Sequence, residues 1–183
     1  DNKACLVGSE MCIRDRGETA TDMITTMVNR TFQSLDAAGV APEDRFKVIT
    51  LAALIQKEAG SVEDMAKVSR VFTNRLNAGW NMESDATIAY GAGHSRVETT
   101  QAEREDPSNI YNTYLYPGLP AGPISNPGDD AINAAIHPAD GPWFFFVTVD
   151  LDTGETVFSE TADEHAAAVE RLQEWWAAHP EIQ

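Results

Sequence analysis

Glu58, at the end of an apolar segment, has the surroundings best suited to proton transfer. Three- and four-residue spacing puts it on one helical face with Leu54 and Ile55. Apolar neighbours and the negative end of a helix dipole both disfavour ionisation, so we expect a raised carboxyl pKa. An acid that keeps its proton near neutral pH can protonate the leaving oxygen of a glycosidic bond. Spacing alone leaves open a solvated side chain or an ion pair with Lys57 or Arg70.

A second candidate group is the run Tyr111, Asn112, Thr113 and Tyr114, followed by a Gly- and Pro-rich stretch at 118–123. Aromatic rings cover the apolar faces of sugars, while amide and hydroxyl groups bind sugar hydroxyls. The run predicts a loop that binds a sugar or a peptide. A purely structural cluster of turns is the alternative.

The third candidate is Asp85, which follows Ser84 at the start of a short segment. The simpler interpretation is that Ser84 or Asp85 caps a helix. A hydrolase with two carboxylates could instead use Asp85 together with Glu58, and the distance between them would decide between inversion and retention. His165 is expected to be a surface or hairpin-packing residue rather than a catalytic base.

The elements that must position these residues are mostly helical, because apolar residues recur at helical spacing over long segments. A long loop-rich middle covers residues 80–130, and such stretches in compact domains are usually functional. The aromatic run 143–146 is predicted to be core. The fold class is α+β, helix-rich with a small C-terminal hairpin. Expected helices cover 19–38, 42–59, 61–79, 85–90, 99–105, 129–136 and 161–176, and expected strands cover 143–149 and 155–159.

Composition limits the function classes. The chain has 183 residues, of which 43% are hydrophobic, and 13 Lys and Arg against 29 Asp and Glu give a net charge of −16. This excess of carboxylates argues against nucleic acid and against electrostatic binding to anionic lipid. No apolar run approaches the ~20 residues that cross a bilayer. The sequence predicts a soluble, acidic domain.

The two cysteines, Cys5 and Cys12, lie near the start of the chain. They could form a disulfide or half of a metal site, but the four histidines lack ligand-like spacing, and we expect neither metal nor cofactor. Residues 5–16 resemble the in-frame translation of a transposon-type sequencing adapter. We therefore expect residues 1–16 to be a non-native segment and residues 17–183 to form the catalytic domain.

Several blocks of residues follow one another in a specific order, and together they resemble the catalytic domain of the endolytic murein transglycosylases, the MltG-type or YceG-like family. The resemblance extends from about residue 19 to the last helix. The blocks are Gln56-Lys57-Glu58, Val71-Phe72-Thr73-Asn74-Arg75-Leu76, Ser84-Asp85-Ala86-Thr87, Tyr111-Asn112-Thr113-Tyr114, Gly118-Leu119-Pro120-Ala121-Gly122-Pro123 and Phe144-Phe145-Phe146-Val147.

The resemblance implies cleavage of the β-1,4 bond between N-acetylmuramic acid and N-acetylglucosamine without water, leaving a 1,6-anhydromuramic end. The family's essential glutamate falls on Glu58, which would act first as acid and then as base. Since one carboxylate serves twice, Asp85 could be structural or could orient the substrate. The resemblance also implies a set of substrate-binding residues: Asn74, Asp85, Thr87, Tyr111, Asn112, Thr113 and Tyr114.

The resemblance further implies an upstream LysM-like subdomain and a membrane helix, which are absent from this sequence. The expected partners are peptidoglycan glycan strands, with cell-wall synthases as candidate protein partners, and the expected location of the full-length protein is the extracytoplasmic face of the bacterial cytoplasmic membrane. Two other functions stay open at this point. They are a hydrolytic glycosidase acting on the same polymer and a non-catalytic glycan-binding module of the cell wall.

Overall fold

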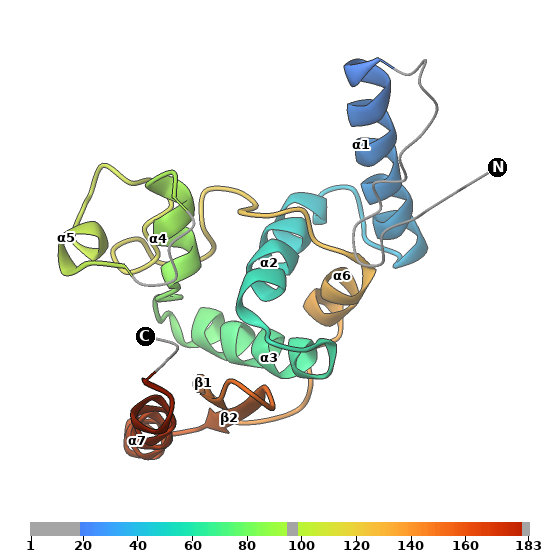
Figure 1. Cartoon of the computed structure of the whole chain (residues 1–183). Helices are drawn as coiled ribbons and strands as arrows, with labels where there is room; N and C mark the ends of the chain where they lie inside the picture. The colour runs from blue at the N-terminus through green and yellow to red at the C-terminus, as the bar shows by residue number, and fades with distance from the viewer. Residues whose placement is uncertain (1–18, 95–98, 181–183) are drawn as a thin grey trace.

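The computed structural model describes residues 19–94 and 99–180, and within them the fold is α+β, as predicted. Figure 1 shows α2 and α6 lying beside each other above α3, with the hairpin and α7 below α3 and α1 projecting at the opposite end. The elements are α1 (Ala20–Ala37), α2 (Arg45–Glu58), α3 (Val62–Ala78), α4 (Asp85–Gly91), α5 (Gln101–Arg104), α6 (Asp129–Ile136), β1 (Phe145–Asp150), β2 (Glu155–Ser159) and α7 (Ala162–Ala178).

The core forms around α2, which packs against α3 and α6. Six consecutive residues of α2, from Thr50 to Ile55, are buried. Burial on every side explains why the apolar pattern of this helix is nearly continuous. Met65, Val68 and Phe72 of α3 complete the centre of the cluster. The last residue of α2 is Glu58, so the buried core fixes its position.

Most helix ends are set by local chemistry. The side chains of Ser61 and Thr161 accept hydrogen bonds from backbone N–H groups in the first turns of α3 and α7. Gly79 ends α3 in a left-handed conformation with φ 70°. The expected start of α2 at residue 42 is wrong. Residues 42–44 form a turn closed by the Asp44 N–H bond to Ala41 O (3.0 Å), and the helix begins at Arg45.

The hairpin is a two-stranded antiparallel sheet in which Phe146 pairs with Phe158 and Val147 with Val157. β1 begins at Phe145, two residues later than expected. Side chains of α3 bind the carbonyl groups of residues 143 and 144, which holds this segment against the helix. α7 packs against β1.

α1 has the predicted extent but little apolar contact. Met23, Ile24, Met27, Val28 and Phe32 are exposed, and Leu35 is the buried residue of this helix. No described helix combines the length and the apolar character needed to cross a membrane. The predicted non-native segment 1–16, with both cysteines, lies outside the described residues.

Candidate active site

Glu58 faces a cavity of about 360 Å³ between the end of α2, α3, the start of α4 and the hairpin. Its carboxylate accepts a hydrogen bond from the Ser84 hydroxyl. Both polar and apolar side chains line the cavity. The polar lining residues are Glu58, Arg75, Glu83, Ser84, Asp85, Tyr114 and His165, and the apolar ones are Phe72, Met82, Phe145 and Phe146.

Burial raises the pKa of the Glu58 carboxyl group above its ordinary value, because the charged form loses hydration. The negative charge of Asp85 acts in the same direction. The hydrogen bond from Ser84 and the positive charge of Arg75 oppose the shift without cancelling it. The direction agrees with the sequence-based expectation. The structure therefore holds a carboxyl group that retains its proton at higher pH than an exposed glutamate does.

Ser84 is held in place by two buried threonines. Its backbone N–H donates to Thr113 Oγ1 (3.1 Å), and its carbonyl accepts from Thr87 Oγ1 (2.7 Å). The two threonine hydroxyls are themselves 2.8 Å apart. Thr87 and Thr113 were predicted to bind substrate, but neither lines the cavity. In the structure they position Ser84, and the predicted contact with substrate stays a prediction.

Asp85 lies in the cavity beside Glu58 but is heavily engaged. Arg104 binds both of its oxygens, from Nε (3.1 Å) and Nη2 (3.0 Å), which gives a bidentate ion pair. The hydroxyl groups of Thr99 (2.6 Å) and Tyr114 (2.9 Å) donate to its Oδ1. Burial and the neighbouring Asp85 raise the pKa of the Tyr114 phenol, so this hydroxyl stays protonated as a donor. This arrangement suits Asp85 to structural and electrostatic work more than to activating water.

Three of the predicted substrate-binding residues lie elsewhere. Asn74 Nδ2 donates to the carbonyl groups of residues 141 (3.1 Å) and 143 (2.8 Å) and fixes the segment before β1. The fully buried Asn112 donates to backbone carbonyls of residues 104 (3.0 Å) and 106 (3.1 Å). Tyr111 packs its ring on Tyr90 at 4.8 Å. All three lie outside the cavity lining, and their contact with substrate stays a prediction.

Sequence reasoning missed Arg75, which is buried in the cavity wall. Its Nε donates to Phe144 O (2.8 Å), its Nη1 donates to Met82 O (2.5 Å), and its guanidinium group lies over the Phe145 ring at 5.6 Å. A signal was present, because Arg75 follows the buried Phe72 by three residues on the same helical face.

Glu83 and the hairpin phenylalanines were also missed. Glu83, with φ 52°, is the non-glycine residue of the described chain that has a positive φ. Its N–H donates to Thr113 O (3.1 Å), which accounts for the unusual conformation. Phe145 and Phe146 are half-buried and line the cavity. Phe146 also packs against the hydrophobic core, as expected, whereas Phe145 is not part of that cluster.

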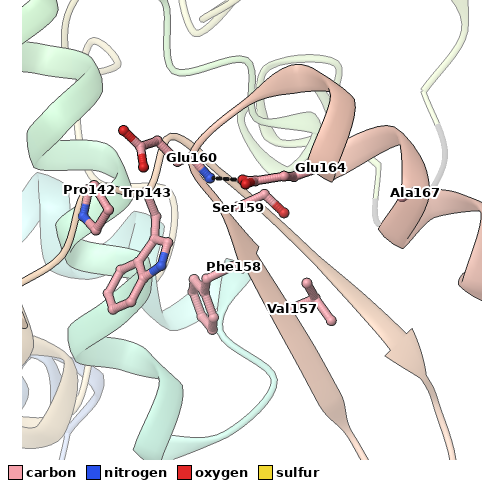
Figure 2. A pocket seen from close by; sticks show the side chains of 8 residues that line it. All are labelled: Pro142, Trp143, Val157, Phe158, Ser159, Glu160, Glu164 and Ala167. Carbon is pink, nitrogen blue, oxygen red and sulfur yellow. Dashed lines mark hydrogen bonds between the residues drawn. The ribbon is translucent and has the colours of Figure 1, made fainter.

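A second hollow of about 480 Å³ is lined by Trp143, β2 and the start of α7. Figure 2 shows Trp143 and Phe158 side by side, with the carboxylate of Glu164 turned toward the backbone N–H of Glu160. That carboxylate also accepts from the Thr161 N–H (3.2 Å) and caps α7. This hollow therefore offers aromatic surface, but its helix-capping carboxylate is not poised for proton transfer.

Among residues 19–94 and 99–180, no cluster of three or more His, Cys, Asp or Glu side chains could hold a metal ion. In the Glu58 cavity, a buried carboxylic acid, a buried cation and a phenol surround a space bordered by aromatic rings. These groups match what general-acid cleavage of a sugar polymer requires.

The fold and this site have the features expected of a glycan-cleaving domain, and comparison with known proteins gives the class. The sequence profile of the YceG-like family matches residues 12–171, so the chain belongs to the YceG-like family. The match begins within the segment predicted to be non-native, whose origin stays a prediction.

Individual relatives agree with the family. The chain is 37% identical over 125 residues to the endolytic murein transglycosylase of Bacillus subtilis, covering 68% of this chain and 34% of that protein. It is 31% identical over 123 residues to the protein of the same name from Streptococcus pneumoniae, covering 65% of this chain and 22% of that protein. The chain thus spans about a third or less of these curated relatives. A YceG-like protein of Listeria monocytogenes has a similar solved structure, with a TM-score of 0.71, 31% identity, and coverage of 84% of this chain and 51% of that one.

Proposed function

We propose that this chain is the catalytic domain of an endolytic murein transglycosylase, a lyase that cuts peptidoglycan strands. The observation that carries the proposal is Glu58, whose carboxyl group has a pKa raised by burial and lines a cavity together with the aromatic side chains of Phe72, Phe145 and Phe146. The names of the relatives from Bacillus subtilis and Streptococcus pneumoniae support the same activity and point to murein as the substrate.

In the proposed reaction Glu58 first donates its proton to the oxygen that links N-acetylmuramic acid to N-acetylglucosamine. The C1–O4 bond breaks, and the leaving sugar keeps the proton as a hydroxyl group. The resulting carboxylate then accepts the proton of the muramic C6 hydroxyl as its oxygen attacks C1. Glu58 is protonated again at the end, no water is consumed, and the product carries a 1,6-anhydro end.

The surroundings of Glu58 suit both halves of this cycle. Burial and Asp85 favour the protonated acid before bond cleavage. Once the proton has left, the Ser84 hydroxyl and the Arg75 charge stabilise the carboxylate. Hydrogen bonds from Arg75 to the carbonyl oxygens of Phe144 and Met82 hold its guanidinium group in the cavity lining.

A hydrolase would need a second carboxylate to activate water. Asp85, the second carboxylate that the sequence suggested, lines the cavity, but Arg104, Thr99 and Tyr114 bind its oxygens. This engagement supports the single-carboxylate mechanism. We further propose peptidoglycan strands as the partner and the extracytoplasmic side of the cytoplasmic membrane as the place of action.

The test is digestion of defined, uncross-linked glycan strands followed by mass spectrometry. We expect products with anhydro ends, whose summed mass equals that of the substrate. Products with reducing ends, heavier by one water, would instead identify a hydrolase. Saturable glycan binding without any products would identify a binding module. The Glu58→Gln variant, digested in parallel, controls for contaminating enzymes.

A further inference from the structure

His165 is a titratable side chain of the Glu58 cavity that the proposed mechanism does not use. It lies in the first turns of α7, where the capping box of Thr161 and Glu164 fixes the start of the helix. Its ring stacks on Phe145 with centroids 5.2 Å apart and an interplanar angle of 18°. The expected packing of His165 on the hairpin is therefore confirmed. The structure also places His165 in the lining of the Glu58 cavity, which the sequence did not predict.

The ring nitrogens of His165 have unused hydrogen-bonding capacity. Nδ1 is buried and has no hydrogen-bond partner. Since Nδ1 is enclosed, Nε2 is the nitrogen left to reach a molecule in the cavity.

The surroundings keep this imidazole neutral. Burial lowers the pKa of His165, and the positive charge of Arg75 lowers it further. A neutral imidazole has one donor and one acceptor nitrogen, and either can bind a hydroxyl or amide group. The charged and titratable groups that share the cavity with it are Glu58 from α2, Arg75 from α3, Glu83, Asp85 and Tyr114; Glu164 is its neighbour on α7.

We propose that the neutral imidazole of His165 binds a hydroxyl or amide group of the glycan strand through Nε2 and so orients the sugar against Glu58. The proposal rests on the proposed function, because it takes the glycan strand as the ligand of this cavity. Sugar hydroxyls and N-acetyl groups both donate and accept hydrogen bonds, so either can pair with a neutral imidazole, whether the nitrogen that meets it is a donor or an acceptor. The stacked Phe145 ring keeps the imidazole at one angle.

The proposal has a consequence for pH dependence. Binding needs His165 neutral, and cleavage needs Glu58 protonated, so kcat/KM should fall on both sides of an optimum. The alkaline limb belongs to Glu58 and the acid limb to His165. Removing the imidazole should abolish the acid limb and leave the alkaline limb in place. A role confined to packing would alter neither limb.

Binding is measured first, in the Glu58→Gln background, where the strand is not consumed. The probe is an uncross-linked glycan strand of defined length, titrated by calorimetry. We expect His165→Phe, which keeps the stacked ring, to weaken affinity about five- to ten-fold, the range of one lost hydrogen bond. His165→Gln, whose amide reaches near the Nε2 position, should restore most of it. His137→Asn, at the exposed end of α6, is the matched control and should bind like the parent.

Turnover is measured second, as a pH profile of kcat/KM for the wild type and His165→Phe. Equal affinities for His165→Phe and its parent, or an unchanged acid limb, would overturn the proposal. Absence of saturable glycan binding in the parent would overturn it as well. A wild-type protein that binds strands through His165 but never releases anhydro ends would instead refute the proposed function. Circular dichroism of each variant separates these outcomes from misfolding.

Discussion

The hairpin borders two hollows, and the larger one carries the less reactive groups. The cavity of about 360 Å³ contains Glu58 and His165 and is walled by Phe145 and Phe146 of β1. The hollow of about 480 Å³ is lined by Glu164 and by residues of β2 (Figure 2). Both have aromatic walls and a carboxylate. Size and the type of lining therefore do not distinguish the two hollows in chemical terms.

The difference lies in how each carboxylate is held. Glu58 ends α2, at the negative end of the helix, and burial raises its pKa. Glu164 lies in the first turn of α7, at the positive end, and backbone N–H groups of Thr161 and Glu160 lower its pKa. The surroundings of Glu58 favour its protonated form, from which a proton can be donated. Those of Glu164 favour its charged form, which caps α7. Position along a helix and burial decide the chemistry here.

The largest expected effect is the loss of activity in Glu58→Gln, and a failure to observe it would contradict the comparison between Glu58 and Glu164. Glu58→Gln keeps the size of the side chain and removes its proton transfer, so the rate of glycan cleavage should fall by about 10³-fold or more. The matched change Glu164→Gln should leave the rate within about two-fold, since an amide can still cap α7. Quantified release of anhydro ends measures both. A comparable loss in the two variants would show that the two carboxylates do not differ in function.

Asp85→Asn should have the next largest effect. The change keeps the hydrogen bonds of Thr99 and Tyr114 but removes the charge that pairs with Arg104 and raises the pKa of Glu58. We expect kcat/KM to fall about ten-fold, by analogy with the loss of a positioning ion pair. The alkaline limb of the pH profile should also move to lower pH.

The pH profile separates the two roles of Asp85. If the rate falls while the alkaline limb stays in place, Asp85 supports only the geometry of the cavity. Asp140→Asn, whose carboxylate is fully exposed and 3.7 Å from Arg70, serves as the control and should change neither quantity.

The helices of this fold could be predicted because their ends are encoded locally. Thr161 with Glu164, Ser61, and Gly79 gave the bounds of α3 and α7 to within a residue or two. The start of β1 could not be predicted in this way. Asn74 and Arg75 bind carbonyls almost 70 residues further along the chain, and no local pattern contains that information.

The same distinction applies to the site. The raised pKa of Glu58 was predictable, because its apolar neighbours Leu54 and Ile55 belong to the same helix. The cavity is formed by segments that are distant in sequence, so His165 could not be assigned to it, whereas the helical spacing from Phe72 placed Arg75 on a buried face without showing that it lines a cavity. Asn112 looked like a sugar ligand, but its amide is used to close the loop around residues 104–106.

The pH dependence of the free energy of unfolding also tests the comparison between Glu58 and Glu164, with a smaller expected effect. A carboxyl group with a pKa raised above the unfolded value stabilises the fold at low pH and loses that contribution as pH rises through the folded pKa. Wild-type protein should therefore lose stability relative to Glu58→Gln as pH increases from the ordinary value of 4.5 upward, with a slope of at most about 1.4 kcal/mol per pH unit. Urea unfolding at several pH values measures the difference. A difference that stays constant with pH would contradict the raised pKa.

The smallest expected effect concerns the other carboxylate and has the opposite sign. Glu164→Ala removes the group that accepts from the Glu160 and Thr161 N–H groups, so the free energy of unfolding at neutral pH should fall slightly. Because the folded pKa of Glu164 is lowered, the stability that it contributes is present above the unfolded pKa and is lost as pH falls through the folded one. The wild type and Glu164→Ala should therefore converge in acid, whereas the wild type and Glu58→Gln diverge in alkali. Convergence of the Glu164 pair at high pH instead would mean that this carboxylate, like Glu58, is held in its protonated form.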